Sequence, residues 1–133
     1  MKIALLGYGR MGKTIASYAQ QRNHQIVYIL DKEHEEGALS EAEVAINFSV
    51  PEAAVSNIKA ALEQKIPVVS GTTGWLEKYE EVVAFCKTHQ SGFLYASNFS
   101  IGVNLFFKIN PFVAQLMHPP QSAYRPEIHA PPH

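Results

Sequence analysis

The sequence predicts an α/β fold, a doubly wound parallel sheet with helices on both faces. Five short apolar runs recur along the chain, at residues 3–6, 26–30, 44–48, 67–69 and 93–96. Each run is nearly continuous in apolar residues, which is typical of strands covered on both faces. Stretches with an apolar period near 3.6 separate the runs. Alternation of strand and helix favours parallel strands joined by right-handed crossovers.

The helices carry start and stop signals of their own. The first helix is expected to end near Asn23, a residue type that suits a helix C-cap. Ser49-Val50-Pro51-Glu52 matches a capping box, which predicts Ser49 as the N-cap of the second helix. A last helix is expected from about 102 to 117, kinked or split by Pro111. The apolar positions of the second and third helices are Ala54, Val55, Ile58, Ala61 and Leu62, and Leu76, Tyr79, Val82, Val83 and Cys86.

Composition argues against a nucleic-acid-binding protein, a membrane protein and a disulfide-bonded protein. The 133 residues include 11 Lys and Arg against 12 Asp and Glu, so the net charge of −1 gives no positive excess for binding nucleic acid. No apolar run approaches the length of a membrane span, and the N-terminus lacks the pattern of a secretory signal. The single cysteine, Cys86, can form neither an internal disulfide nor a Cys-x-x-Cys metal site. We expect a cytoplasmic protein with no nucleic-acid partner, no membrane partner and no metal site.

A glycine loop follows the first strand. Gly7, Gly9 and Gly12 form a G-x-G-x-x-G between a strand and a helix. The three glycines would permit a tight turn, close approach to a pyrophosphate and close packing of helix and strand, as in a Rossmann-type dinucleotide site. Asp31 ends the second strand 19 residues after Gly12, at the spacing of a carboxylate that binds the adenosine ribose. The alternative is a glycine turn and a surface acid with no ligand.

The residues beside Asp31 bear on the choice of cofactor. A carboxylate at this position favours NAD, because it would repel a 2′-phosphate. Lys32 and Arg10 could offset that repulsion and admit NADP, or they could be solvated charges without a ligand. We therefore expect either NAD or NADP to be usable.

Small polar segments follow the other strands. They are residues 47–49, 70–74 and 97–102, and each carries hydroxyl or amide groups. Ligands of doubly wound sheets collect beyond the carboxyl ends of the strands. Taken alone, Gly71-Thr72-Thr73-Gly74 could be a simple tight turn. Because all three segments are expected at the edge that holds the glycine loop, we expect them to contact the ligand.

Four of these segments resemble one family. Gly9-Arg10-Met11-Gly12, Ile46-Asn47-Phe48-Ser49 with Pro51-Glu52-Ala53, Gly71-Thr72-Thr73-Gly74 and Ala96 to Asn104 are similar to 4-hydroxy-tetrahydrodipicolinate reductases, over residues 1 to about 117. The resemblance implies hydride transfer from NADH or NADPH to a cyclic unsaturated dicarboxylate in diaminopimelate–lysine biosynthesis, with Thr73 also touching substrate. The candidate cofactor-binding residues are Gly7, Tyr8, Gly9, Arg10, Met11, Gly12, Asp31, Lys32, Phe48, Ser49, Gly71, Thr72, Thr73, Ala96, Ser97, Asn98 and Phe99.

The chain departs from the family pattern in two places. The glycine loop is one residue shorter than the common version. The family's second domain, which holds substrate, supplies the proton donor and builds a homotetramer, is largely absent. We therefore expect a dinucleotide-binding domain over 1–118 and a tail over 119–133, which holds five of the eight prolines. His129 and His133 are expected to be tail residues.

These departures limit the expected activity. No catalytic residue is assigned, and the 133-residue chain alone is expected to have little or no reductase activity. It should be monomeric or weakly associating, with an exposed apolar patch where the second domain would dock. Two alternatives stay open: a non-catalytic module that binds a dinucleotide, and another two-domain NAD(P) dehydrogenase, such as one acting on aspartate or its semialdehyde products.

Overall fold

A computed structural model describes residues 1–32 and 34–118. The chain divides into two compact units, Met1–Ser97 and the part that begins at Asn98. The first unit contains a six-stranded sheet of order β3-β2-β1-β4-β5-β6. Its strands are β1 (Lys2–Leu6), β2 (Gln25–Asp31), β3 (His34–Gly37), β4 (Val44–Asn47), β5 (Val68–Ser70) and β6 (Phe93–Tyr95). The five predicted apolar runs are all strands, and the α/β class is confirmed.

β3 is the strand that the apolar pattern did not predict. It reads His-Glu-Glu-Gly, it is exposed along its whole length, and it pairs antiparallel with β2 while the other strands pair parallel. An edge strand with both faces in water needs no apolar side chains, because backbone hydrogen bonds to one neighbour hold it. Hydrophobic periodicity therefore could not reveal it.

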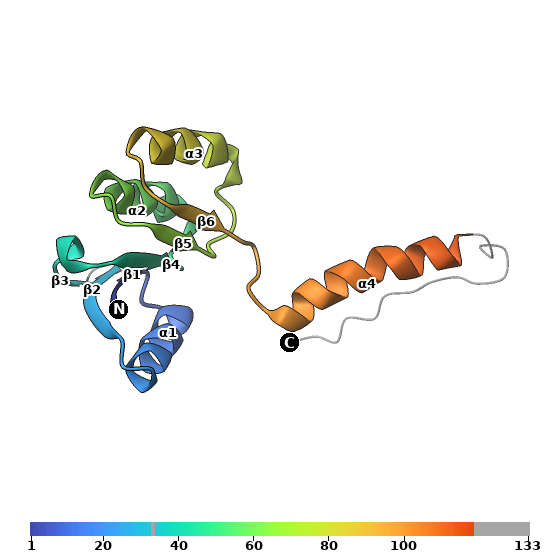
Figure 1. The fold of residues 1–133 in the computed structure, drawn as a ribbon, viewed down its shortest axis with the longest axis horizontal. Helices are drawn as coiled ribbons and strands as arrows, with labels where there is room; N and C mark the ends of the chain where they lie inside the picture. The colour runs from blue at the N-terminus through green and yellow to red at the C-terminus, as the bar shows by residue number, and fades with distance from the viewer. Residues whose placement is uncertain (33, 119–133) are drawn as a thin grey trace. The chain divides into compact units, whose positions relative to one another are not determined.

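Helices cover both faces of the sheet, as predicted. α1 (Arg10–Gln21) lies on one face, and α2 (Pro51–Glu63) and α3 (Tyr79–Thr88) lie on the other (Figure 1). The α1 face buries Ile3 and Leu5 of β1 against Ala16 and Ala19. The opposite core is larger, and its fully buried residues include Leu6, Ile58, Leu62, Val68 and Val82.

Two details of the helix ends test the cap predictions. α1 ends where it was expected to end, but its C-cap is Arg22, and Asn23 is the next residue, with φ +58°. The prediction that Ser49 caps α2 is wrong. Val50 is the N-cap and Pro51 begins the helix, while the Ser49 hydroxyl donates to Asn47 Oδ1 over 2.8 Å. That local bond competes with capping.

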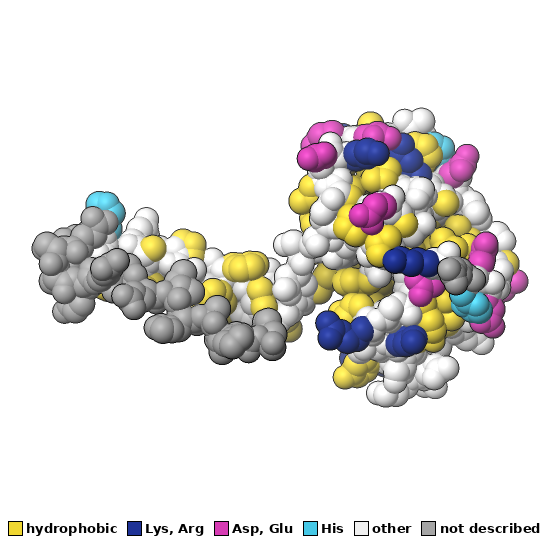
Figure 2. Space-filling model, turned by 180° about the vertical axis from the view of Figure 1, so that it is seen from behind, with side chains coloured by type: hydrophobic (Ala, Val, Ile, Leu, Met, Phe, Trp, Pro, Cys, Tyr) yellow, Lys and Arg dark blue, Asp and Glu magenta, His cyan; other side chains and the backbone are white. Residues whose placement is uncertain are grey.

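The second unit is described as far as residue 118, and its main element is α4 (Ile101–Met117). Ser100 caps this helix by accepting from the Val103 N–H. The helix runs unbroken through Pro111, so it is not split there, and the kink stays a prediction. None of its residues is buried, and hydrophobic side chains show on its surface in Figure 2.

Some predictions concern residues that the structure does not describe, or boundaries that it does not test. The tail at 119–133, with His129 and His133, lies outside them. The domain boundary at 118 stays a prediction, although α4 belongs to a different compact unit from the sheet. Within residues 1–32 and 34–118, no helix combines the length and apolar character needed to cross a membrane.

Candidate functional site

Three loops meet at the carboxyl edge of the sheet because backbone hydrogen bonds fix the start of each. The Gly7 N–H donates to the Leu30 carbonyl over 2.7 Å, which ties the glycine loop to the end of β2. The Phe48 N–H donates to the Leu6 carbonyl over 2.9 Å. The Gly71 N–H donates to the Asn47 carbonyl over 3.0 Å. The predicted site residues of β1, β2, β4 and β5 are therefore brought together.

The glycines of the first loop have different surroundings. A Cβ at Gly7, where φ is +104°, would fall within 3.0 Å of the Phe48 carbonyl. A Cβ at Gly12 would fall equally close to the Gly7 carbonyl. A Cβ at Gly9 would meet nothing within 4 Å. Gly7 and Gly12 are thus required by packing, whereas Gly9 leaves open space at the start of α1.

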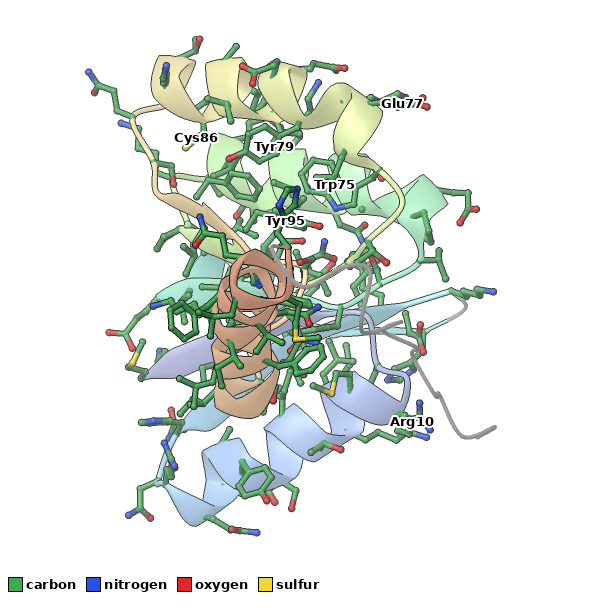
Figure 3. The ribbon with its side chains drawn as sticks, turned by 90° about the vertical axis from the view of Figure 1, so that its right-hand side faces the viewer. Arg10, Trp75, Glu77, Tyr79, Cys86 and Tyr95 are labelled. Carbon is green, nitrogen blue, oxygen red and sulfur yellow. The ribbon has the colours of Figure 1, made fainter. Side chains whose placement is uncertain are left out.

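Among the residues that the structure describes, no side chain caps the N-terminus of α1. Gly9 is the N-cap, and the first turn contains no acidic residue. The first N–H groups of an α-helix have no partner within the helix, and they carry its partial positive charge. Arg10 lies at this end of α1 and points outward (Figure 3). This arrangement suits an anion such as a pyrophosphate.

A pocket of about 200 Å³ lies beside the glycine loop. Its lining includes two of the candidate cofactor-binding residues, Asp31 at the end of β2 and Lys32 directly after it. It also includes residues that the sequence analysis missed, Val50, Ala53 and Asn57, from the start of α2. Their spacing of three and four residues puts them on one helix face, and that periodicity was the signal for finding them. Gly7, Leu30 and Ser49 complete the lining.

A larger hollow, of about 450 Å³, opens at the opposite end of the sheet. Its lining includes Met1, Lys2 and Gln25, at the amino ends of β1 and β2. Ligands of doubly wound sheets bind beyond the carboxyl ends of the strands. The smaller pocket beside Asp31 is therefore the candidate site.

The loops after β4 and β5 pack against each other. A Cβ at Gly71 would overlap the Phe48 ring, so a glycine is needed where that ring lies. The Ser49 N–H donates to Thr72 Oγ1 over 2.9 Å. Thr72 is buried, whereas Thr73 is exposed at the same edge. The two loops thus form one surface that leaves the Thr73 side chain accessible.

The last predicted segment is divided between the two units. Ala96 and Ser97 belong to the sheet unit, and the Ala96 N–H donates to the Ser70 carbonyl over 3.2 Å. Asn98 and Phe99 belong to the second unit. There the Asn98 side chain accepts from the Ser100 N–H over 2.8 Å, next to the start of α4. A role for Asn98 and Phe99 in binding the cofactor stays a prediction.

Metal chemistry has no candidate residues in the described part of the chain. Among residues 1–32 and 34–118, no three or more His, Cys, Asp or Glu side chains gather as a metal-binding group would. Cys86, one of the apolar positions expected in the third helix, is buried, and its thiol donates to the Ser91 carbonyl.

Comparisons with other sequences agree with the motifs. A family model described as the N-terminus of dihydrodipicolinate reductase matches residues 1–99. A 4-hydroxy-tetrahydrodipicolinate reductase of Christiangramia forsetii is 53% identical over 119 residues, covering 88% of this chain and 50% of that protein. One from Staphylococcus saprophyticus is 33% identical, covering 82% of this chain and 48% of that protein. The chain thus spans about half the length of the curated relatives it matches.

Solved structures show the same fold at low identity. A putative homoserine dehydrogenase from Archaeoglobus fulgidus aligns with a TM-score of 0.60 and 16% identity, covering 71% of this chain and 42% of that one. A hyperthermophilic archaeal homoserine dehydrogenase in complex with NADPH aligns with a TM-score of 0.56 and 15% identity, covering 71% and 43%. At these identities the likeness supports the fold alone. By its sequence, the chain belongs to the dihydrodipicolinate reductase family and contains the N-terminal region of that family.

Proposed function

We propose that this chain is the dinucleotide-binding part of a 4-hydroxy-tetrahydrodipicolinate reductase. The complete protein would transfer hydride from NADH or NADPH to a cyclic unsaturated dicarboxylate in diaminopimelate–lysine biosynthesis. The names of the relatives at 53% and 33% identity support the reaction. The homoserine dehydrogenases share only the fold and do not favour a different substrate.

The observation that carries the proposal is the open space above the uncapped start of α1, next to the Asp31 pocket. Gly9 and the free N–H groups of the first turn would hold the pyrophosphate. Asp31 would bind the adenosine ribose, and the apolar walls Leu30, Val50 and Ala53 suit a purine base. The other half of the dinucleotide would extend toward Phe48, Ser49 and the Gly71–Thr73 loop. The reduced nicotinamide supplies the hydride.

The Asp31 pocket also bears on which cofactor is preferred. Asp31 and Lys32 line it together, so an attractive and a repulsive charge both face a 2′-phosphate. We expect Asp31→Ser to weaken NADH binding by about tenfold while NADPH binding holds or improves. Titration of both cofactors measures the ratio of the two dissociation constants. If the ratio of the NADH and NADPH dissociation constants is unchanged in Asp31→Ser, Asp31 does not contact the cofactor.

Gly9→Ala tests the binding proposal directly. The new methyl group meets nothing in the structure, and φ at Gly9 is −72°, so the fold should keep its melting temperature within about 2 °C. The same methyl group would occupy the space assigned to the pyrophosphate, so we expect NADH affinity to fall at least about tenfold. Ser17→Ala, on the exposed face of α1, is the matched control and should bind as the wild type does. Isothermal titration of wild type and both variants gives the answer, and equal affinities would refute the site.

Activity, assembly and location belong to the complete protein. We propose a cytoplasmic homotetramer for it, with the 133-residue chain monomeric or weakly associating and with Thr73 touching substrate. No catalytic residue is assigned within this chain, so it should bind NADH without turning over substrate. Robust reductase activity of the 133-residue chain would contradict that assignment.

A further inference from the structure

A buried polar network joins the ends of β4 and β5 directly behind the proposed cofactor site. Asn47 and Ser70 are the last residues of these strands and lie opposite each other in the parallel register. Asn47 Nδ2 donates to Ser70 Oγ over 3.0 Å, and Ser49 Oγ donates to Asn47 Oδ1 over 2.8 Å. Asn47 and Ser70 are both 0% exposed. One side-chain amide therefore connects the end of β5 with the loop that follows β4.

Thr72 closes the network from the other loop. Its hydroxyl accepts from the Ser49 N–H over 2.9 Å, and its carbonyl accepts from Trp75 Nε1 over 2.6 Å. Trp75 is anchored in turn, because its ring packs edge-on against Tyr95 and tilted against Tyr79 (Figure 3). The β4 and β5 loops are thus held to each other and to the core by side chains that lie behind the surface.

Stability alone does not account for this network. Burying a polar group costs free energy unless it is hydrogen-bonded, and a pair of apolar residues of similar shape can be about as stable. The strands around Asn47 and Ser70 bury mainly apolar residues: Ala45 on β4, Val68 on β5, and Ala4 and Leu6 on the neighbouring β1. What the polar network adds is a fixed geometry for the two loops. Fixing a site before the ligand arrives lowers the cost of binding.

We infer that Asn47 is a positioning residue of the cofactor site, whose amide holds the Phe48–Ser49 and Gly71–Thr73 segments in the geometry that receives the nicotinamide half of the dinucleotide. The inference rests on the proposed function. Asp31 is assigned to the adenosine half, at the end of β2, whereas Asn47 acts on the loops of β4 and β5. Ser49 also lies at the Asp31 pocket, so loss of Asn47 should weaken binding of the nicotinamide half strongly and binding of the adenosine half only slightly.

The test compares NADH with ADP, which lacks the nicotinamide half. Asn47→Ala should weaken NADH binding by about tenfold and leave ADP binding within about twofold. Asn47→Asp should restore NADH binding to within about threefold, because the hydroxyls of Ser49 and Ser70 can both donate to a carboxylate. Val82→Ala removes buried atoms from α3 without touching the network, so it should lower stability and leave both affinities unchanged. Titrations are made at a temperature where all variants are folded.

Each outcome decides a different point. Wild type that binds neither NADH nor ADP refutes the proposed function, and this inference with it. Wild type that binds NADH while Asn47→Ala binds it equally well refutes the inference alone. Equal weakening of NADH and ADP, or the same losses in Val82→Ala, would mean that Asn47 only stabilises the fold. If Asn47→Ala does not fold, Ser70→Ala removes the partner of the amide instead and should show the same selective loss of NADH affinity.

Discussion

The sheet unit and α4 use apolar residues in opposite ways. In the sheet unit, α1, α2 and α3 each bury residues against the sheet. α4 is more apolar, with Lys108 as its one charged residue, yet Phe112 and Leu116 are both 61% exposed and no residue of the helix is buried. A helix that is apolar on every side is normally buried in a larger protein. Hydrophobic content alone therefore does not make a core, because a helix also needs a surface to cover.

The same substitution in the two regions gives the largest contrast. Leu62 in α2 is 0% exposed, so Leu62→Ala should lower the free energy of unfolding by about 3 kcal/mol through lost burial and a cavity. Leu105→Ala in α4 removes the same atoms from a side chain that is 54% exposed. It should change the free energy of unfolding by less than about 0.5 kcal/mol. Urea denaturation followed by circular dichroism measures both. Similar losses for the two variants would mean that α4 is packed as tightly as the core.

A polar group in the sheet core gives a smaller effect that depends on pH. Burial, together with the hydrogen bond and negative charge of Glu35, raises the pKa of Tyr28 to about 12 from its usual 10.0. Below pH 10 the residue is neutral in both states and its contribution to stability is complete. Between pH 10 and 12 the unfolded chain loses the proton first, so stability falls as pH rises.

Removing the hydroxyl isolates that contribution. Tyr28→Phe should cost about 1 kcal/mol near pH 8, because the 2.7 Å hydrogen bond to Glu35 is lost. The gap between wild type and variant should narrow above pH 10. Tyr18→Phe, an exposed tyrosine on α1, is the control and should show neither effect. Urea denaturation at a series of pH values measures the difference in free energy of unfolding between wild type and Tyr28→Phe. A difference that grows above pH 10 would contradict the raised pKa of Tyr28.

The sequence was informative where local pattern determines structure. Gly7, Gly12 and Asp31 could be placed because a tight turn and a strand end have fixed spacing requirements. The role of Asn47 could not be predicted, since its hydrogen bond to Ser70 joins residues 23 positions apart. β3 was not predicted, because an exposed edge strand has no apolar period. For α4 the period predicted a helix correctly, but an apolar period does not show whether a covering surface is present.

Removing the second unit should have little effect on the first. Of the residues that the structure describes, 1–32 and 34–118, all those with buried apolar side chains lie within Met1–Ser97. A chain ending at Ser97 should therefore unfold within about 1 kcal/mol of the 133-residue chain. Urea denaturation compares the two, with Leu62→Ala in both lengths as an internal reference. A loss of several kcal/mol would show that the sheet depends on residues after 97.

The smallest expected change in stability comes from charging α4 itself. Ile109 and Phe112 are three residues apart on one helix face and both are more than half exposed, so replacing them by Glu removes no buried contact. Stability should stay within about 0.5 kcal/mol of wild type. Self-association should change instead, because exposed apolar patches promote contact between copies.

Sedimentation equilibrium should show weak association of the wild-type chain at high concentration and a monomer for Ile109→Glu/Phe112→Glu. Gln115→Glu adds charge without removing an apolar side chain and should associate as the wild type does. If the double variant associates as strongly as the wild type, the exposed apolar side chains of α4 do not cause the self-association.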